Sequence, residues 1–144
     1  MAHWLLKTEP GAYAWADLVK DGSTPWTGVA NPQAQGNLRA MKAGDRVVVY
    51  HSGEKRVMGV AEIAKAAYPD PGSPGAVCVD VRAVEPLPAP VPLEALKQEP
   101  AFEGSALLRQ GRLSVVPLSA AEWGAIGTLA AAIAGAGGPR PRRS

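Results

Sequence analysis

Proline and glycine are spread along most of this chain, and they constrain its fold more than any other feature. The 144 residues include 14 prolines and 16 glycines. Both residues interrupt regular elements and favour turns, so many short elements fit this sequence better than a bundle of long helices does. A chain of this length is near the commonest domain size and can bury one core. We therefore expect one small domain.

Five segments between these breaks have the patterns of β-strands. Alternating or continuous apolar positions, rich in β-branched and aromatic residues, indicate strands. Such patterns occur at residues 3–8, 46–51, 56–64, 76–85 and 113–116. The second and third segments flank a turn at Gly53-Glu54, which predicts a β-hairpin.

Short helices are predicted between and after these strands. Residues 13–20 and 93–98 are expected to form two of them. Asn31-Pro32 joins a favoured N-cap to a proline at the first helical position, which predicts a helix to about Met41. Ser119 and Glu122 form a capping box that opens a last helix. Segments 21–25, 68–74 and 86–92 are expected to be connections, and the whole pattern predicts an α+β domain with a partly closed barrel.

The charge of the chain is concentrated at its C-terminal end. The formal net charge is +2, and Arg140, Arg142 and Arg143 lie within the last five residues. Without these three arginines, the chain has 12 basic and 13 acidic side chains. The body is therefore not a strongly basic nucleic-acid clamp. Residues 135–144 offer little to bury and are expected to be a disordered tail, which leaves 1–134 as the domain.

Cysteine content and apolar patterning bear on the compartment. Cys78 is the only cysteine, which excludes a disulfide within the chain and is typical of a reducing compartment. The N-terminus has no basic leader followed by an apolar stretch. The longest apolar stretch, 128–136, is too short to span a bilayer. We expect a cytoplasmic domain without membrane contact.

No catalytic or metal-binding motif is evident. Two histidines and one cysteine are too few for a zinc site of the usual kind. His51 and Ser52 are neighbours on a predicted strand, so their side chains point to opposite faces and cannot act as base and nucleophile. Phosphate loops, dinucleotide fingerprints and Gly-x-Ser-x-Gly elbows are absent. We expect a non-enzymatic protein without a cofactor.

An ordered set of motifs carries a family resemblance over residues 2–126. The set comprises Trp4-Leu5-Leu6-Lys7-Thr8-Glu9-Pro10, Thr24-Pro25-Trp26-Thr27-Gly28-Val29-Ala30-Asn31, Gln33-Ala34, Asn37-Leu38-Arg39-Ala40-Met41, Gly44-Asp45, Tyr50-His51-Ser52, Gly59-Val60-Ala61-Glu62, Ala67-Tyr68-Pro69-Asp70, Arg109-Gln110-Gly111-Arg112-Leu113-Ser114-Val115 and Glu122-Trp123. On these residues the chain resembles the EVE domain family of the PUA-like superfamily, which is related to the YTH readers of methylated RNA. The resemblance implies a small PUA-like mixed β-barrel of five to six strands with short peripheral helices.

The resemblance also implies a function. Family members are expected to hold a modified base in a pocket, and modified cytosine in DNA is the ligand implied here, with RNA as an open alternative. A flipped base needs an apolar or aromatic platform and a few hydrogen-bonding groups for its edge. We expect a monomeric domain that binds nucleic acid in this way.

The candidate site residues fall into two groups. Those expected to bind the ligand are Lys7, Thr8, Trp26, Asn31, Gln33, Ala34, Tyr50, His51 and Ser114, and those expected to contact the nucleic-acid backbone are Arg39 and Arg112. Structural explanations remain open for several of them. Trp26 is also compatible with a core position, Asn31 with helix capping alone, and His51 with a buried structural role.

Three positions depart from the family pattern. Ala30 and Gln35 replace basic residues, and Pro32 replaces an aromatic one. Losing two charges beside a nucleic-acid site is expected to weaken phosphate contact. A second hypothesis is therefore a small-molecule domain that binds a nucleoside-like metabolite and has lost the nucleic-acid surface. An enzyme that uses the same pocket is a third hypothesis, for which no acid–base pair is found.

Overall fold

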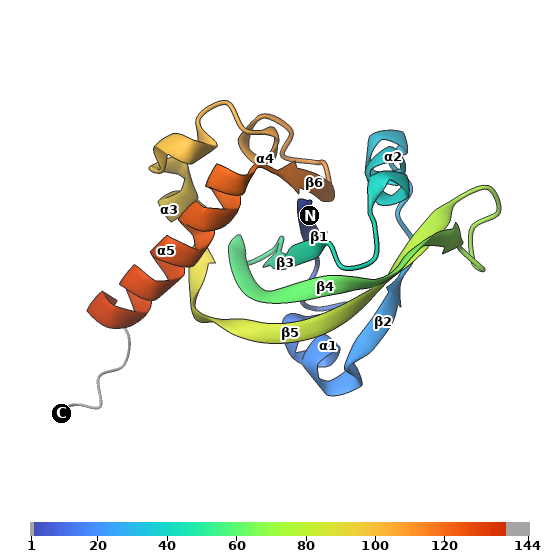
Figure 1. Cartoon of the computed structure of the whole chain (residues 1–144), viewed down its shortest axis with the longest axis horizontal. Helices are drawn as coiled ribbons and strands as arrows, with labels where there is room; N and C mark the ends of the chain where they lie inside the picture. The colour runs from blue at the N-terminus through green and yellow to red at the C-terminus, as the bar shows by residue number, and fades with distance from the viewer. Residues whose placement is uncertain (1, 138–144) are drawn as a thin grey trace.

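A computed structural model describes residues 2–137 and contains one six-stranded sheet (Figure 1). The strands are β1 (His3–Thr8), β2 (Ser23–Trp26), β3 (Arg46–His51), β4 (Arg56–Pro69), β5 (Val77–Pro92) and β6 (Val115–Leu118). Their order is β2-β5-β4-β3-β1-β6. Strands β1 and β3 are parallel, and the other neighbours are antiparallel. This is the mixed α+β architecture that the sequence predicts.

The sheet is strongly bent along β4 and β5, its two longest strands (Figure 1). The pairing of β4 with β5 shifts register at four places, and the pairing of β3 with β4 shifts once. Such bulges bend and twist the strand that carries them. The bending wraps the sheet partly around its core, which includes Leu5, Val48 and Phe102.

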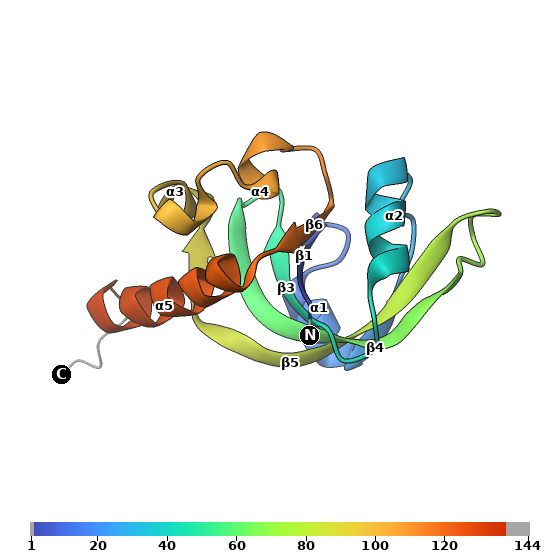
Figure 2. The ribbon, with the colours of Figure 1, turned by 45° about the horizontal axis from the view of Figure 1, so that its top comes forward.

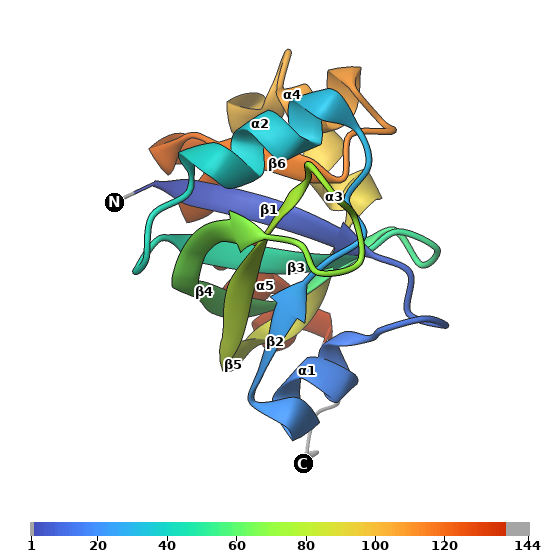
Figure 3. The same cartoon turned by 90° about the vertical axis from the view of Figure 1, so that its right-hand side faces the viewer.

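Five α-helices and one 3-10 helix lie around the sheet in the described part of the chain. They are α1 (Trp15–Asp21), α2 (Pro32–Ala40), α3 (Leu93–Lys97), η1 (Pro100–Phe102), α4 (Ala106–Arg109) and α5 (Ala120–Gly137). Helices α3, α4 and α5 gather on one side of the molecule, and α2 stands apart from them (Figure 2). Helix α2 packs beside β6, next to β1 (Figure 3).

Two segments that were predicted as connections are strands. Their prolines lie at sheet positions where a missing backbone N–H breaks no strand pairing. Segment 21–25 mostly belongs to β2, an edge strand whose outer side needs no partner for Pro25. Segment 86–92 extends β5, where proline occurs at every second position. Strand β2 pairs with β5 only from Val79 to Arg82. The outer side of β5 after Arg82 therefore has no neighbouring strand. Alternate prolines can face this open side without breaking the β4–β5 ladder.

Other predicted boundaries shift by a few residues. Strand β4 includes Tyr68 and Pro69, which were predicted to begin a connection, and β6 begins two residues later than predicted. The capping box is confirmed, because Glu122 N–H donates to Ser119 Oγ over 3.1 Å and Ser119 N–H donates to Glu122 Oε1 over 2.6 Å.

Helix α5 covers residues 135–137 of the predicted tail, and 138–144 lie outside the described residues. Within the described part, no helix is long and apolar enough to cross a membrane.

Gly59 provides the space in which Trp15 packs on the sheet. Trp15 begins α1 and is 7% exposed, and a methyl group on Gly59 would overlap its indole ring. We expect Gly59→Ala to lower the free energy of unfolding by about 1–3 kcal/mol, because the overpacked ring must move. Gly124→Ala is the control, since nothing lies within 4 Å of the added methyl group in α5. Urea unfolding of both variants checks this, and equal stability of Gly59→Ala and the unaltered protein would contradict it.

Candidate functional site

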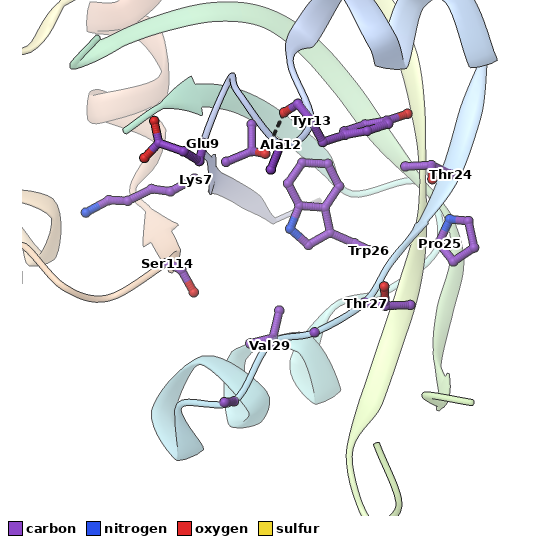
Figure 4. Close-up of a pocket in the computed structure, with 13 residues that line it drawn as sticks. Lys7, Glu9, Ala12, Tyr13, Thr24, Pro25, Trp26, Thr27, Val29 and Ser114 are labelled. Atoms are coloured by element: carbon purple, nitrogen blue, oxygen red, sulfur yellow. Dashed lines mark hydrogen bonds between the residues drawn. The ribbon is translucent and has the colours of Figure 1, made fainter. Parts of the chain in front are cut away.

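A cavity of about 550 Å³ opens where the ends of β1 and β2 come near each other (Figure 4). Its walls come from the end of β1 and the turn after it, from β2 and the loop that leads to α2, and from the residue before β6. The lining residues are Lys7, Thr8, Glu9, Ala12, Tyr13, Thr24, Pro25, Trp26, Thr27, Gly28, Val29, Ala30 and Ser114. Ligand pockets commonly have volumes of about 300–1,000 Å³, so this cavity is large enough for a small ligand.

Two aromatic side chains form one side of the cavity. Trp26 is 8% exposed, and its ring lies edge-to-face with that of Tyr13, with 6.2 Å between the ring centroids. Thr8 Oγ1 donates a hydrogen bond of 2.6 Å to the backbone oxygen of Tyr13 (Figure 4). Tyr13 Oη donates in turn to Asp21 Oδ2 over 2.8 Å. These contacts fix the turn after β1 and thereby this wall of the cavity.

Lys7 and Ser114 lie across the cavity from Trp26, and the ammonium of Lys7 points away from the Trp26 ring (Figure 4). Lys7 Nζ donates to the backbone oxygen of Gly111 over 2.8 Å and lies 5.7 Å from the centre of the Tyr50 ring. Burial lowers the pKa of Lys7 from its ordinary value, because desolvation penalises the ammonium. The backbone N–H of Lys7 donates to the oxygen of Ser114 over 2.9 Å, which ties the two residues together.

The loop between β2 and α2 forms the floor of the cavity, and two buried side chains hold it. Gly28 has a φ of 78°, a left-handed conformation that suits glycine. Its N–H donates to Asp70 Oδ2 over 3.0 Å. Gln35 Nε2 donates to the oxygens of Val29, over 2.7 Å, and Val77, over 3.0 Å, while Gln35 Oε1 accepts from Val77 N–H over 2.8 Å. The loop is therefore fastened to the β4–β5 end of the sheet.

The position of Gln35 changes what its departure from the family pattern means. The sequence suggested a lost charge beside the nucleic-acid surface. Gln35 is only 6% exposed, and its whole amide group is hydrogen-bonded inside the protein. It therefore positions the cavity floor and is not available for a phosphate. Ala30 does line the cavity, and Pro32 is exposed at the start of α2.

Loss of the Gln35 amide should weaken both the fold and the cavity. Gln35→Leu leaves the oxygens of Val29 and Val77 and one N–H without their partner, so we expect a loss of about 1–3 kcal/mol in the free energy of unfolding. Gln33→Leu is a matched control, because Gln33 lies on the same helix and is exposed. Chemical denaturation of both variants measures the difference, and an equal loss in the two would refute the role of Gln35.

Four of the predicted site residues meet at this cavity, namely Lys7, Thr8, Trp26 and Ser114. Asn31, Gln33 and Ala34 do not line it. Asn31 Oδ1 accepts from Ala34 N–H over 3.0 Å and caps α2, as its position predicts. Gln33 is exposed, and Ala34 is fully buried in the core.

Tyr50 and His51 lie beneath the site and are buried. His51 Nε2 accepts from the backbone N–H of Trp15 over 2.9 Å, and its Nδ1 lies 2.8 Å from Glu54 Oε1. Because Nε2 accepts, Nδ1 carries the proton and donates to Glu54. His51 thus anchors the start of α1. Tyr50 lies behind Lys7 and does not line the cavity.

The two predicted backbone contacts lie outside the cavity. Arg39 is exposed, donates to the oxygen of Gly75 over 3.3 Å, and borders a second hollow of about 420 Å³ on the far side of the cavity floor. The two hollows share Gly28, Val29 and Ala30. Arg112 is exposed beside Gly111, which accepts from Lys7. Both arginines are therefore exposed outside the cavity.

Several lining residues were not predicted from the sequence. Glu9, Ala12 and Tyr13 lie in the turn after β1, and Thr24 and Pro25 lie in a strand that the sequence indicated as a connection. Glu9, Thr24 and Pro25 belong to two of the family motifs, and no other feature of the sequence pointed to these lining residues. In the part of the chain that the structure describes, no three His, Cys, Asp or Glu residues gather in a way that could hold a metal ion.

The bent sheet and a cavity lined by both polar and apolar side chains define a small α+β domain with a candidate ligand site. The EVE domain model matches residues 2–129 of the chain. The human relative called thymocyte nuclear protein 1 is 31% identical over an alignment 159 positions long, which covers 85% of this chain and 71% of that protein. A chicken protein of the same name is 41% identical over 81 residues, but the alignment covers only 34% of its length and 47% of this chain. The chain belongs to the EVE domain family.

Solved structures agree with this assignment. Protein Rpa0253 from Rhodopseudomonas palustris is 41% identical and has a TM-score of 0.86, with 92% of this chain and 95% of that chain covered. The human THYN1 protein in complex with 5-methylcytosine-containing DNA is 32% identical, with a TM-score of 0.80 and coverage of 90% and 98%. A yeast YTH domain from Zygosaccharomyces rouxii, at 15% identity and a TM-score of 0.59, shares the fold.

Proposed function

We propose that this domain binds a modified cytosine in DNA and holds the base in the cavity beside Trp26. The observation that carries the proposal is the human THYN1 protein, which shares the fold and 32% of aligned residues and was solved with 5-methylcytosine-containing DNA. A recessed cavity can receive a base only after the base leaves the duplex stack. The cavity offers what such a base requires, namely aromatic walls at Tyr13 and Trp26 and hydroxyl groups at Thr8 and Ser114.

The low charge of the domain body bears on how the duplex is held. Phosphate contacts contribute most of the sequence-independent affinity of DNA-binding proteins, and each adds to the salt dependence of binding. Arg39 and Arg112 are exposed near the two hollows and are the residues we assign to phosphates. Because the basic side chains of the body are balanced by acidic ones, we expect the base in the cavity to contribute a large share of the binding free energy. The ratio of the affinities for modified and unmodified cytosine is then expected to persist when the salt concentration rises, because salt weakens the phosphate contacts to both duplexes.

Titration of labelled duplexes tests this proposal. Duplexes that carry one methylated or hydroxymethylated cytosine, and an unmodified control of the same sequence, are titrated with the protein at low salt and at about 0.15 M salt. We expect tighter binding to a modified duplex at both salt concentrations. Equal binding to all duplexes, or no binding even at low salt, would refute the proposal.

A small nucleoside-like metabolite is the second candidate ligand. Ala30, which stands where the family pattern has a basic residue, lines the cavity and adds no charge to its wall. A ligand that binds only the folded state raises the melting temperature. If free modified nucleosides raised it while oligonucleotides did not, this second function would replace the first. Under either function the domain binds its ligand and does not convert it.

A further inference from the structure

The indole nitrogen of Trp26 is a buried hydrogen-bond donor without an acceptor in the described part of the chain. Trp26 is 8% exposed. Its ring lies edge-to-face with that of Tyr13, and its Nε1 has no hydrogen-bond partner among the described residues. Trp4, which is 7% exposed, shows the usual arrangement, because its Nε1 donates to Asp45 Oδ2 over 3.0 Å. Buried indole N–H groups generally find a partner, and leaving one unmet is unfavourable.

This donor faces into the cavity. Figure 4 shows the nitrogen-bearing edge of the Trp26 indole turned toward the open space between Lys7, Ser114 and Val29. The hydroxyl of Thr8 is already engaged, because it donates to the oxygen of Tyr13 over 2.6 Å. Lys7 Nζ also has a partner, at the oxygen of Gly111 over 2.8 Å. The Lys7 ammonium keeps further hydrogens and Ser114 also carries a hydroxyl, but both side chains are only half-buried. The Trp26 N–H is the buried donor of the aromatic wall that has no acceptor in the described protein.

An indole N–H can donate a hydrogen bond but cannot accept one. The group opposite it in a complex must therefore carry a lone pair. On a cytosine ring, N3 and the O2 carbonyl are such groups. The O2 carbonyl is shared with thymine, but N3 of thymine carries a hydrogen and cannot accept, so N3 is the acceptor that distinguishes cytosine. Enzymes and readers that hold a flipped base recognise it through hydrogen bonds to this edge.

We propose that Trp26 determines specificity by donating its Nε1–H to the ring nitrogen N3 of the bound cytosine. This inference rests on the proposed function, since it assigns the orientation of the base in the same cavity. The lone-pair edge of the base faces Trp26, and the exocyclic amino group points away from it. A base that presents an N–H in this place is disfavoured, because two donors would then face each other in a buried site.

The test removes the indole N–H of Trp26 and keeps the shape of its side chain. Site-specific incorporation of β-(benzothiophen-3-yl)alanine at position 26 replaces the indole N–H by sulfur. We expect about 3- to 12-fold weaker binding to a duplex with one 5-methylcytosine, which corresponds to one neutral hydrogen bond. The melting temperature of the free domain should not fall, because the N–H has no acceptor in the described protein. The same replacement at Trp123, a half-buried residue outside the cavity that stacks near His3, is the control and should leave affinity unchanged.

Proton NMR provides a second readout on the unaltered domain. The Trp26 Nε1–H resonance, assigned with the Trp26→Phe variant, should move downfield and exchange more slowly with water when the methylated duplex is bound. Undiminished affinity after the position-26 replacement, or an unmoved resonance in the saturated complex, would overturn this inference alone. Failure of the unaltered domain to bind any methylated duplex would instead overturn the proposed function and the inference with it.

Discussion

Replacing Asp45 by alanine should lower the free energy of unfolding by about 3–5 kcal/mol, which is the largest stability effect that we expect from a single polar side chain here. Asp45 is 5% exposed and lies in the turn before β3. Its carboxylate accepts from Trp4 Nε1 over 3.0 Å, from Lys42 N–H over 3.0 Å and from Ala2 N–H over 3.2 Å. Alanine would leave three donors without an acceptor at the place where β1 begins.

The same carboxylate makes stability depend on pH. Burial alone would raise the pKa of Asp45, but the hydrogen bonds from Lys42, Trp4 and Ala2 outweigh it, and the pKa is lowered in the folded protein. Because the folded-state pKa lies below the unfolded-state value, the stabilisation is fully present above the unfolded-state value. It is lost as the pH falls through the folded-state pKa, so the loss begins near pH 4 and continues below it.

Urea unfolding at pH 7 and at a series of acidic pH values measures both effects. Asp17→Ala is the matched control, because Asp17 also accepts from a backbone N–H, that of Ala14 over 2.8 Å, but is exposed. We expect the control to lose about 1 kcal/mol or less. The difference between Asp45→Ala and the unaltered protein should shrink as the pH falls below 4. A difference that stays constant down to pH 2, or a loss no larger than that of the control, would contradict this account.

Filling the cavity should abolish most DNA binding without harming the fold. Ser114 lines the cavity and is half-buried, and the hydrogen bond that involves it is made by its backbone oxygen, to Lys7 N–H. In Ser114→Trp, the large side chain occupies the space assigned to the base, while that backbone bond remains. We expect about 100-fold weaker binding to a methylated duplex, the effect typical of losing a central contact. Removing Trp26 is less informative, because Trp26 also belongs to the hydrophobic core.

A second variant, which fills the other hollow, tests which of the two hollows holds the base. Ser73 lines the second hollow, on the other side of the loop that forms the cavity floor, and does not line the cavity. Ser73→Trp should therefore leave the preference for the modified base intact. The melting temperature of both variants shows whether they fold, and fluorescence anisotropy with labelled duplexes measures their affinity. Loss of the preference in Ser73→Trp but not in Ser114→Trp would place the base in the second hollow instead.

Local signals in the sequence predicted much of the fold. The apolar run Arg46–His51 is β3, and the Asn31-Pro32 pair begins α2 with the expected side-chain cap. Strand β2 and the end of β5 were missed because proline is unfavourable within a sheet, and only the strand order shows that their outer sides are unpaired. Whether a segment rich in proline can form a strand thus depends on its place in the sheet, which the sequence does not show directly.

The candidate site was predicted in part for a similar reason. Trp26 and Ser114 lie 88 positions apart, and the family motifs that contain them pointed to both. The same motifs cannot say which way a side chain points. Asn31 caps a helix, Ala34 faces the core and Gln35 fastens the cavity floor, although all three are close in the sequence to Trp26. Their roles depend on the direction of α2 relative to the sheet.

The most direct test of the central claim is chemical-shift mapping of the ¹⁵N-labelled domain with a duplex that carries one 5-methylcytosine. If the cavity holds the base, the largest changes should occur at Trp26, Gly28, Val29 and Ser114. An unmodified duplex should change these signals much less. Changes confined to residues away from the cavity, such as those of α5, or equal changes with both duplexes, would contradict the claim that this cavity recognises a modified base.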